Sequence, residues 1–179
     1  MHAAAGNLKK VSLELGGKSP VLVYPDANLE TAIPGVAMAA FMLQGQNCVC
    51  GGTRVGEQGY FVAPTVYTDC TPDMRIVREE IFGPVMAIQT FDRETPEELA
   101  ARANDTNYGL SASIWTRALR TAHTMSRLID AGQVGVTRHA AMDPSMPFGG
   151  FKQSGWGREF GADALELYLR TKAVTVTWD

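Results

Sequence analysis

Hydrophobic and polar positions along the 179-residue chain alternate between two kinds of pattern. Short runs rich in β-branched and aromatic residues predict strands, because such side chains suit a pleated, half-buried surface. Longer stretches with apolar residues three or four positions apart predict helices. The expected strands cover residues 11–15, 20–24, 61–68, 85–91, 111–116, 133–137 and 173–178.

Helices are expected between these strands. One opens at Asp26 and runs towards Gln46, one opens at Thr95, one covers 118–129 and one covers 162–169. Pro34 belongs to the first turns of the first helix or kinks it. Thr95 and Pro96 supply an N-cap and a proline at the first helical position. The alternation predicts an α/β fold with a largely parallel sheet and flanking helices.

Composition and charge exclude several classes of partner. The chain is 45% hydrophobic and 20% charged, as expected of a globular protein with one substantial core. Its net charge of −3, with no basic block, attracts neither nucleic acid nor an anionic membrane. No signal sequence and no apolar run of membrane-spanning length are present, so we expect a cytoplasmic protein with small-molecule partners.

The cysteines and the glycine-rich turns bear on metal and phosphate binding. Three cysteines without a secretion signal favour reduced thiols. Cys48 and Cys50 could form half of a metal site, but no second closely spaced pair follows, so no metal is expected. The run 17–19 resembles the end of a P-loop, but Ser12 stands where the pattern needs glycine. The glycines of 155–161 are spaced one residue too long for a dinucleotide fingerprint and follow a loop.

The segment 138–158 is a long loop rich in glycine and proline. Long loops in compact domains are often functional. We expect it to face substrate, because Met142, Phe148 and Trp156 would be costly to leave hydrated. The alternative is a structural loop whose aromatic side chains plug the core.

A thiol and a carboxylate stand in settings that suggest covalent catalysis. Cys48 ends the run Gln-Gly-Gln-Asn-Cys after an apolar helical stretch, and Glu14 lies in Leu-Glu-Leu-Gly-Gly-Lys-Ser-Pro. Two further runs, Arg-Glu-Glu-Ile-Phe-Gly-Pro at 78–84 and Pro-Phe-Gly-Gly-Phe-Lys-Gln-Ser-Gly at 147–155, complete a set of four ordered motifs. Together they resemble the aldehyde dehydrogenase superfamily over nearly the whole chain. The motif sequences are most similar to those of the phenylacetaldehyde and betaine-aldehyde branches.

This resemblance implies oxidation of an aldehyde to a carboxylate with NAD, or with NADP. Cys48 matches the family's nucleophile, which forms a thiohemiacetal and then a thioester, and Glu14 matches the base. A free cysteine has a pKa near ~8.5, so this thiol must be activated by its surroundings.

Other positions match the family individually. For the cofactor, Glu80 matches the acid that holds the nicotinamide ribose and Phe82 the aromatic beside it. Leu15, Gly16 and Gly17 match the backbone that packs against the nicotinamide. The positions that match the aldehyde tunnel are Asn47, Val49, Met142 and Phe148. Their apolar character suggests an uncharged aldehyde, aromatic or of medium chain length.

The chain also departs from the family pattern. The glycine turn that seats the pyrophosphate and the asparagine that donates to the oxyanion both lie upstream of the matched region. Between Arg54 and Gly59, four residues replace helices and strands of the catalytic domain. Leu43, Gly135 and Thr137 stand where the family has asparagine, tryptophan and asparagine.

We therefore expect a catalytic-domain remnant over 1–171, with an internal deletion near 55–58, and an oligomerisation strand over 172–179. Cofactor binding should be impaired and the isolated chain weakly active or inactive. Two alternatives stay open, a non-catalytic structural or interaction remnant and a cofactor-independent thiol esterase. The period-two pattern of 173–178 predicts a homo-oligomer, with a dimer as the expected form.

Overall fold

The central sheet of the molecule consists of three parallel strands. The computed structural model describes residues 2–6, 9–41, 51–139 and 142–178. The strands are β2 (Val21–Val23), β6 (Ser111–Trp115) and β7 (Gln133–Val136), in the order β2-β6-β7. The central strand, β6, is almost entirely buried, as expected for a parallel strand covered on both faces.

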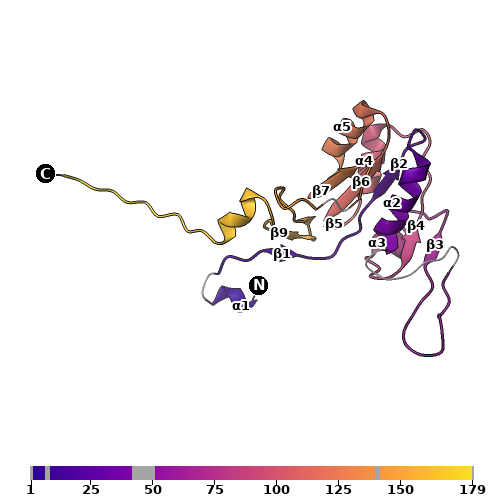
Figure 1. The fold of residues 1–179 in the computed structure, drawn as a ribbon, viewed down its shortest axis with the longest axis horizontal. Helices are drawn as coiled ribbons and strands as arrows, with labels where there is room; N and C mark the ends of the chain where they lie inside the picture. Colours follow the sequence, from indigo (N-terminus) through magenta and orange to yellow (C-terminus); the bar gives the residue numbers. More distant parts are fainter. Residues whose placement is uncertain (1, 7–8, 42–50, 140–141, 179) are drawn as a thin grey trace.

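Helices cover both faces of this sheet. Alternate side chains of a strand point to opposite faces. On one face, Ile114 packs with residues of α4 (Pro96–Asn104) and α5 (Leu119–Leu128) in the main hydrophobic core. On the other face, the indole of Trp115 leaves no room for a Cβ at Gly35 of α2 (Leu29–Phe41). The result is a helix–sheet–helix arrangement (Figure 1), which confirms the predicted α/β class.

A second parallel pair lies beside the main sheet. It joins β3 (Thr65–Tyr67) to β4 (Val85–Ala87), and the short helix α3 (Arg75–Arg78) lies in the connection between them. The backbone then continues from α3 through Glu80 into β4. This second pair therefore places one of the predicted cofactor-binding residues next to the sheet.

Two short antiparallel ladders join the glycine-rich loop to other parts of the chain, one to the N-terminal segment and one to the residues just before β6. Strand β1 (Leu13–Glu14) pairs with β9 (Gly155–Trp156), and β5 (Tyr108–Gly109) pairs with β8 (Phe151–Lys152). Each ladder has only two residues on either side. They matter because they carry Glu14 onto the segment that contains Ser154.

Several predicted boundaries were wrong. The helix expected from Asp26 begins at Leu29, because the Asp26 carboxylate instead accepts hydrogen bonds from Thr116 and from the backbone at the start of α5. Pro34 lies in the first turns of α2, as expected. The helix expected over 162–169 is a 3-10 helix, η1 (Ala162–Leu167). A four-residue helix, α1 (His2–Ala5), was not predicted.

The C-terminal residues 173–178 form no strand within the chain. They are extended and unpaired and point away from the body of the molecule (Figure 1). A strand needs a partner edge, and no edge in the described part of the chain reaches this segment. Their predicted pairing with a neighbouring subunit remains a prediction.

The segment around the expected internal deletion is a protruding hairpin. Arg54 and Val62 form an antiparallel bridge, and Val55–Gln58 lies in the turn between them. The Tyr60 side chain at its end is fully exposed, and the hairpin extends away from the sheet (Figure 1). The strand expected over 61–68 consequently starts only at Thr65.

None of the helices in the described ranges has the length and apolar character needed to cross a bilayer.

Candidate functional site

Glu14, the predicted base, lies on β1 opposite Gly155 of β9. Its side chain is exposed to solvent. The next amide, that of Leu15, donates to the Ser154 carbonyl at 3.0 Å, so the ladder continues one residue beyond the strand. This continuation directs the backbone into the Gly16–Gly17 turn.

Glu80 meets the Gly16–Gly17 turn directly. The Gly17 amide donates to Glu80 Oε1 at 2.9 Å, and the Glu80 side chain is half-buried. A Cβ at Gly16 would overlap the Glu80 carboxylate, so only glycine allows this approach. The structure thus brings together Gly16, Gly17 and Glu80, three of the residues assigned to the cofactor.

Lys18 adds a second contact between the same two segments. Its ammonium donates to the Ile76 carbonyl in α3 at 2.6 Å. Burial lowers the pKa of Lys18, although the nearby Cys70 and Glu80 act in the opposite direction. In the sequence, Lys18 belongs to the rejected phosphate-loop pattern and to the motif around Glu14, but no contact was predicted for its side chain. The glycine–glycine–lysine run is the sequence signal that could have identified this contact between Lys18 and Ile76.

Ser154 contacts the turn from the other side. Its hydroxyl donates to the Gly16 carbonyl at 2.6 Å and accepts from the Gly109 amide at 2.9 Å. The side chain is fully buried. Sequence reasoning missed this residue, because its partners come from segments far away along the chain.

Phe82 lies two residues after Glu80 and its side chain is 80% exposed. A tight turn from Ile81 to Gly83, closed by a 2.8 Å hydrogen bond between their backbones, presents the ring to solvent. An exposed ring beside a carboxylate can cover a flat ligand group. The chemistry of these residues would suit a nicotinamide riboside, since a carboxylate can accept hydrogen bonds from hydroxyls and the Gly16–Gly17 backbone would permit close approach.

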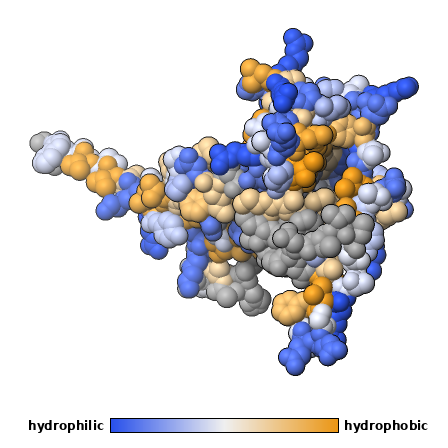
Figure 2. Space-filling view, turned by 45° about the vertical axis from the view of Figure 1, so that its right-hand side comes forward, coloured by the Kyte–Doolittle hydropathy of each residue, from blue (hydrophilic) through white to orange (hydrophobic). Residues whose placement is uncertain are grey.

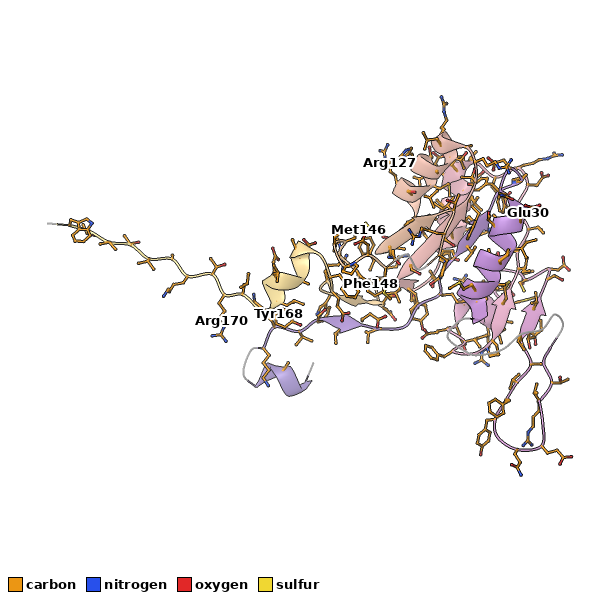
Figure 3. All side chains as sticks on the ribbon, viewed as in Figure 1. Glu30, Arg127, Met146, Phe148, Tyr168 and Arg170 are labelled. Carbon is orange, nitrogen blue, oxygen red and sulfur yellow. The ribbon has the colours of Figure 1, made fainter. Side chains whose placement is uncertain are left out.

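The loop 138–158 leaves exposed two of the three apolar side chains that were expected to be costly to hydrate, Met142 and Trp156. Met142 is 59% exposed, and Phe148 is half-buried and paired through its backbone with Glu159. Figure 3 shows Phe148 and Met146 between the sheet and the 3-10 helix that precedes Tyr168. Trp156 is half exposed and its indole donates to the Val11 carbonyl. The alternative in which the aromatics of this loop plug the core is therefore wrong.

The remaining predicted site residues lie outside the described residues. These are Cys48, Asn47 and Val49, together with Cys50 and Leu43. Within the described ranges, no group of three or more His, Cys, Asp or Glu side chains could hold a metal ion.

Comparison with known proteins identifies the family. The sequence profile of the aldehyde dehydrogenase family matches residues 1–55 and 48–174. An aldehyde dehydrogenase of Davidiella tassiana is 35% identical over 240 residues, covering 97% of this chain and 48% of the relative. The 4-trimethylaminobutyraldehyde dehydrogenase of Rattus norvegicus is 33% identical, covering 98% of this chain and 50% of the relative.

Solved structures agree with this result. The NAD+ complex of an aldehyde dehydrogenase from Bacillus cereus is 34% identical, with a TM-score of 0.91 over 100% of this chain and 49% of that chain. An NAD-dependent aldehyde dehydrogenase from Sinorhizobium meliloti is also 34% identical, with a TM-score of 0.90 over 98% of this chain and 48% of that chain. The chain spans about half the length of the relatives that it matches. Because one family profile matches both residues 1–55 and residues 48–174, the chain belongs to the aldehyde dehydrogenase family.

Proposed function

We propose that this chain contributes the catalytic residues and the nicotinamide end of the cofactor site to an NAD(P)-dependent aldehyde dehydrogenase. The observation that carries the proposal is the hydrogen bond between the Gly17 amide and Glu80, next to a Gly16 whose Cβ would displace the Glu80 carboxylate. This turn directly follows Glu14. The similarity to a Bacillus cereus enzyme solved as an NAD+ complex supports the same assignment.

In this proposal Cys48 is the nucleophile. Its thiolate adds to the aldehyde carbonyl and forms a thiohemiacetal, and loss of hydride converts this adduct to a thioester. The chemistry that a bound nicotinamide supplies is acceptance of that hydride. Glu14, whose side chain is exposed, then takes a proton from the water that hydrolyses the thioester.

The cofactor is held through its ribose and nicotinamide. Glu80 accepts hydrogen bonds from ribose hydroxyls, and Phe82 covers the adjacent group. Met142 and Phe148 are the proposed contacts for an uncharged aldehyde, together with Asn47 and Val49. Because these contacts address only one end of the cofactor, we expect weak NAD-dependent turnover from the 179-residue chain alone.

A thiol esterase activity is the second candidate function. Acyl transfer to Cys48 and hydrolysis assisted by Glu14 need no hydride acceptor. The exposed Glu14 side chain favours this activity, since water reaches it without a cofactor in place. Release of nitrophenol from its acetate should disappear in Cys48→Ala and fall less in Glu80→Gln.

The proposed cofactor site is tested by titrating the chain with NAD and recording the fluorescence of its 3 tryptophans. NAD should change the fluorescence of the wild-type chain. Gly16→Ala should weaken that binding by at least about tenfold, because its Cβ displaces a carboxylate whose charged hydrogen bond is worth ~1.5–3 kcal/mol. NADH formation with phenylacetaldehyde is then measured on the same samples.

Gly83→Ala is the matched control, because a Cβ there meets only Ile81, at an ordinary distance of 3.8 Å. Its NAD affinity should equal that of the wild type. An unchanged fluorescence of the wild-type chain at millimolar NAD would contradict the proposed cofactor site.

A further inference from the structure

We infer that Ser154 is a positioning residue that orients Glu80 through the peptide group between Gly16 and Gly17. The inference rests on the proposed function, because it assigns Glu80 to the cofactor. Ser154 itself touches neither cofactor nor substrate in this assignment. Its effect passes through one planar peptide unit.

The peptide unit is held on both of its sides. Its carbonyl, that of Gly16, accepts from the Ser154 hydroxyl at 2.6 Å. Its amide, that of Gly17, donates to Glu80 Oε1 at 2.9 Å. A trans peptide is planar, and its C=O and N–H point in opposite directions. The direction that Ser154 imposes on the carbonyl therefore fixes the direction in which the amide meets Glu80.

The hydrogen bonds form a single chain with one polarity. The Gly109 amide donates to the Ser154 hydroxyl, the hydroxyl donates to the Gly16 carbonyl, and the Gly17 amide donates to Glu80. Successive hydrogen bonds of one sense polarise each other. This series of hydrogen bonds starts at Gly109 on β5 and ends at the Glu80 carboxylate. It therefore connects β5 to the proposed ligand-binding group.

The surroundings of Ser154 are tightly packed. The side chain is fully buried, and a Cβ at Gly150 would lie 2.6 Å from the Ser154 Cβ. The following residue, Gly155, has a φ of +123° and no space for a side chain against the Leu13 carbonyl. Glycines thus enclose a small hydroxyl residue. A serine here is explained by the two groups that it bridges.

Loss of the hydroxyl would remove the partner of the buried Gly109 amide and of the half-buried Gly16 carbonyl. Such groups are costly, so the turn would reorient towards another partner. The Gly17 amide would then lose its alignment with Glu80. The expected consequence is a weaker cofactor site without direct damage to either cofactor contact.

The test compares Ser154→Ala with Ser113→Ala by amide hydrogen exchange on the full chain. Ser113, on β6 of the main sheet, is also fully buried. Its hydroxyl lies 3.2 Å from His139 Nδ1. Both variants lose one buried hydroxyl. The Gly17 amide should exchange at least about tenfold faster in Ser154→Ala, because its local opening becomes easier. In Ser113→Ala it should change only as far as global stability changes.

NAD affinity provides the second readout. It should fall in Ser154→Ala and stay at the wild-type value in Ser113→Ala. Equal Gly17 exchange in the two variants would overturn the inference. Faster Gly17 exchange in Ser154→Ala, with no NAD response from the wild type, would support the role of Ser154 and contradict the proposed cofactor site.

A measurement on the wild type covers the case in which Ser154→Ala does not fold. If one chain of hydrogen bonds holds the turn, the Gly17 and Gly109 amides should be protected to a similar degree, since both open with Ser154. Widely different protection of these two amides would overturn the inference.

Discussion

At the scale of single residues, the buried polar groups determine how the molecule responds to pH. The His139 ring lies beside Ser113 of β6, and burial lowers the pKa of its imidazole. The folded state thus prefers neutral His139, whereas the unfolded chain titrates near ~6.5. Between those two pKa values the unfolded state binds more protons, so the free energy of unfolding falls as the pH drops below ~6.5.

We therefore predict that the wild-type chain loses stability between about pH 7.5 and about pH 5.5, and that His139→Gln loses less. Urea denaturation at the two pH values measures the difference. Carboxylates with lowered pKa values, such as Asp26 and Glu98, lose their contribution only at lower pH, near ~4 and below. Equal losses in the wild type and the variant would contradict the assignment to His139.

The thiols should differ in reactivity. Cys70 is 8% exposed, and its sulfur lies 3.6 Å from the Tyr67 carbonyl. Alkylation follows thiolate fraction and access. We predict that limiting iodoacetamide at neutral pH modifies Cys48 well before Cys70 or Cys50, as read by peptide mapping. Slowest labelling at Cys48, or equal labelling of all three, would show that Cys48 is not an activated nucleophile.

At the scale of elements, α4 shows how a local capping sequence stabilises the N-terminal end of a helix. The Thr95 hydroxyl accepts from the Glu98 amide at 3.2 Å, and the Glu98 carboxylate accepts from the Thr95 amide at 2.8 Å. This is a complete capping box, with Pro96 at the first helical position. The helix buries Leu99 and Ala100 in the main core, so fraying of this end would expose core residues.

Thr95→Ala should lower the free energy of unfolding by about 1 kcal/mol, the usual cost of losing an N-cap. Thr95→Ser keeps the hydroxyl and should retain most of the stability. Chemical denaturation of the three chains decides the point. A Thr95→Ala variant as stable as the wild type would mean that α4 is held by packing alone.

At the scale of the whole molecule, exposed apolar residues gather on the C-terminal extension. Val174, Val176 and Trp178 are exposed on a segment that points away from the body, and Figure 2 shows its apolar atoms unburied. An extended segment with period-two apolar positions and a free edge suits pairing with another sheet. A second copy of the chain is the proposed partner.

We predict that the full chain is an oligomer, with a dimer as the expected form, and that a chain ending at Thr171 is monomeric. Light scattering at micromolar concentration measures both. A full chain that is already monomeric would exclude this role for 172–179. A dimer unaffected by the truncation would place the interface elsewhere.

The sequence by itself determined the elements whose signals are local. The parallel strands β2, β6 and β7 and the helix α5 were predicted close to their observed bounds, and the start of α4 was predicted at its N-cap, because apolar periodicity and caps act within a few residues. The four motifs likewise predicted the family. One departure from the family pattern has a local cost: Thr137 has a φ of 53°, a conformation that the asparagine expected there tolerates better than a β-branched residue does.

Only the tertiary structure decided how the site is connected. Ser154 lies 138 positions from Gly16, and Glu80 lies 63 positions from Gly17. No periodicity links such pairs, and the two-residue ladders on either side of Ser154 are too short to be predicted from sequence. Hydrogen bonds between distant segments depend on where the chain places their donors and acceptors. The predicted residues were therefore readable from sequence, whereas the path from Ser154 to Glu80 was not.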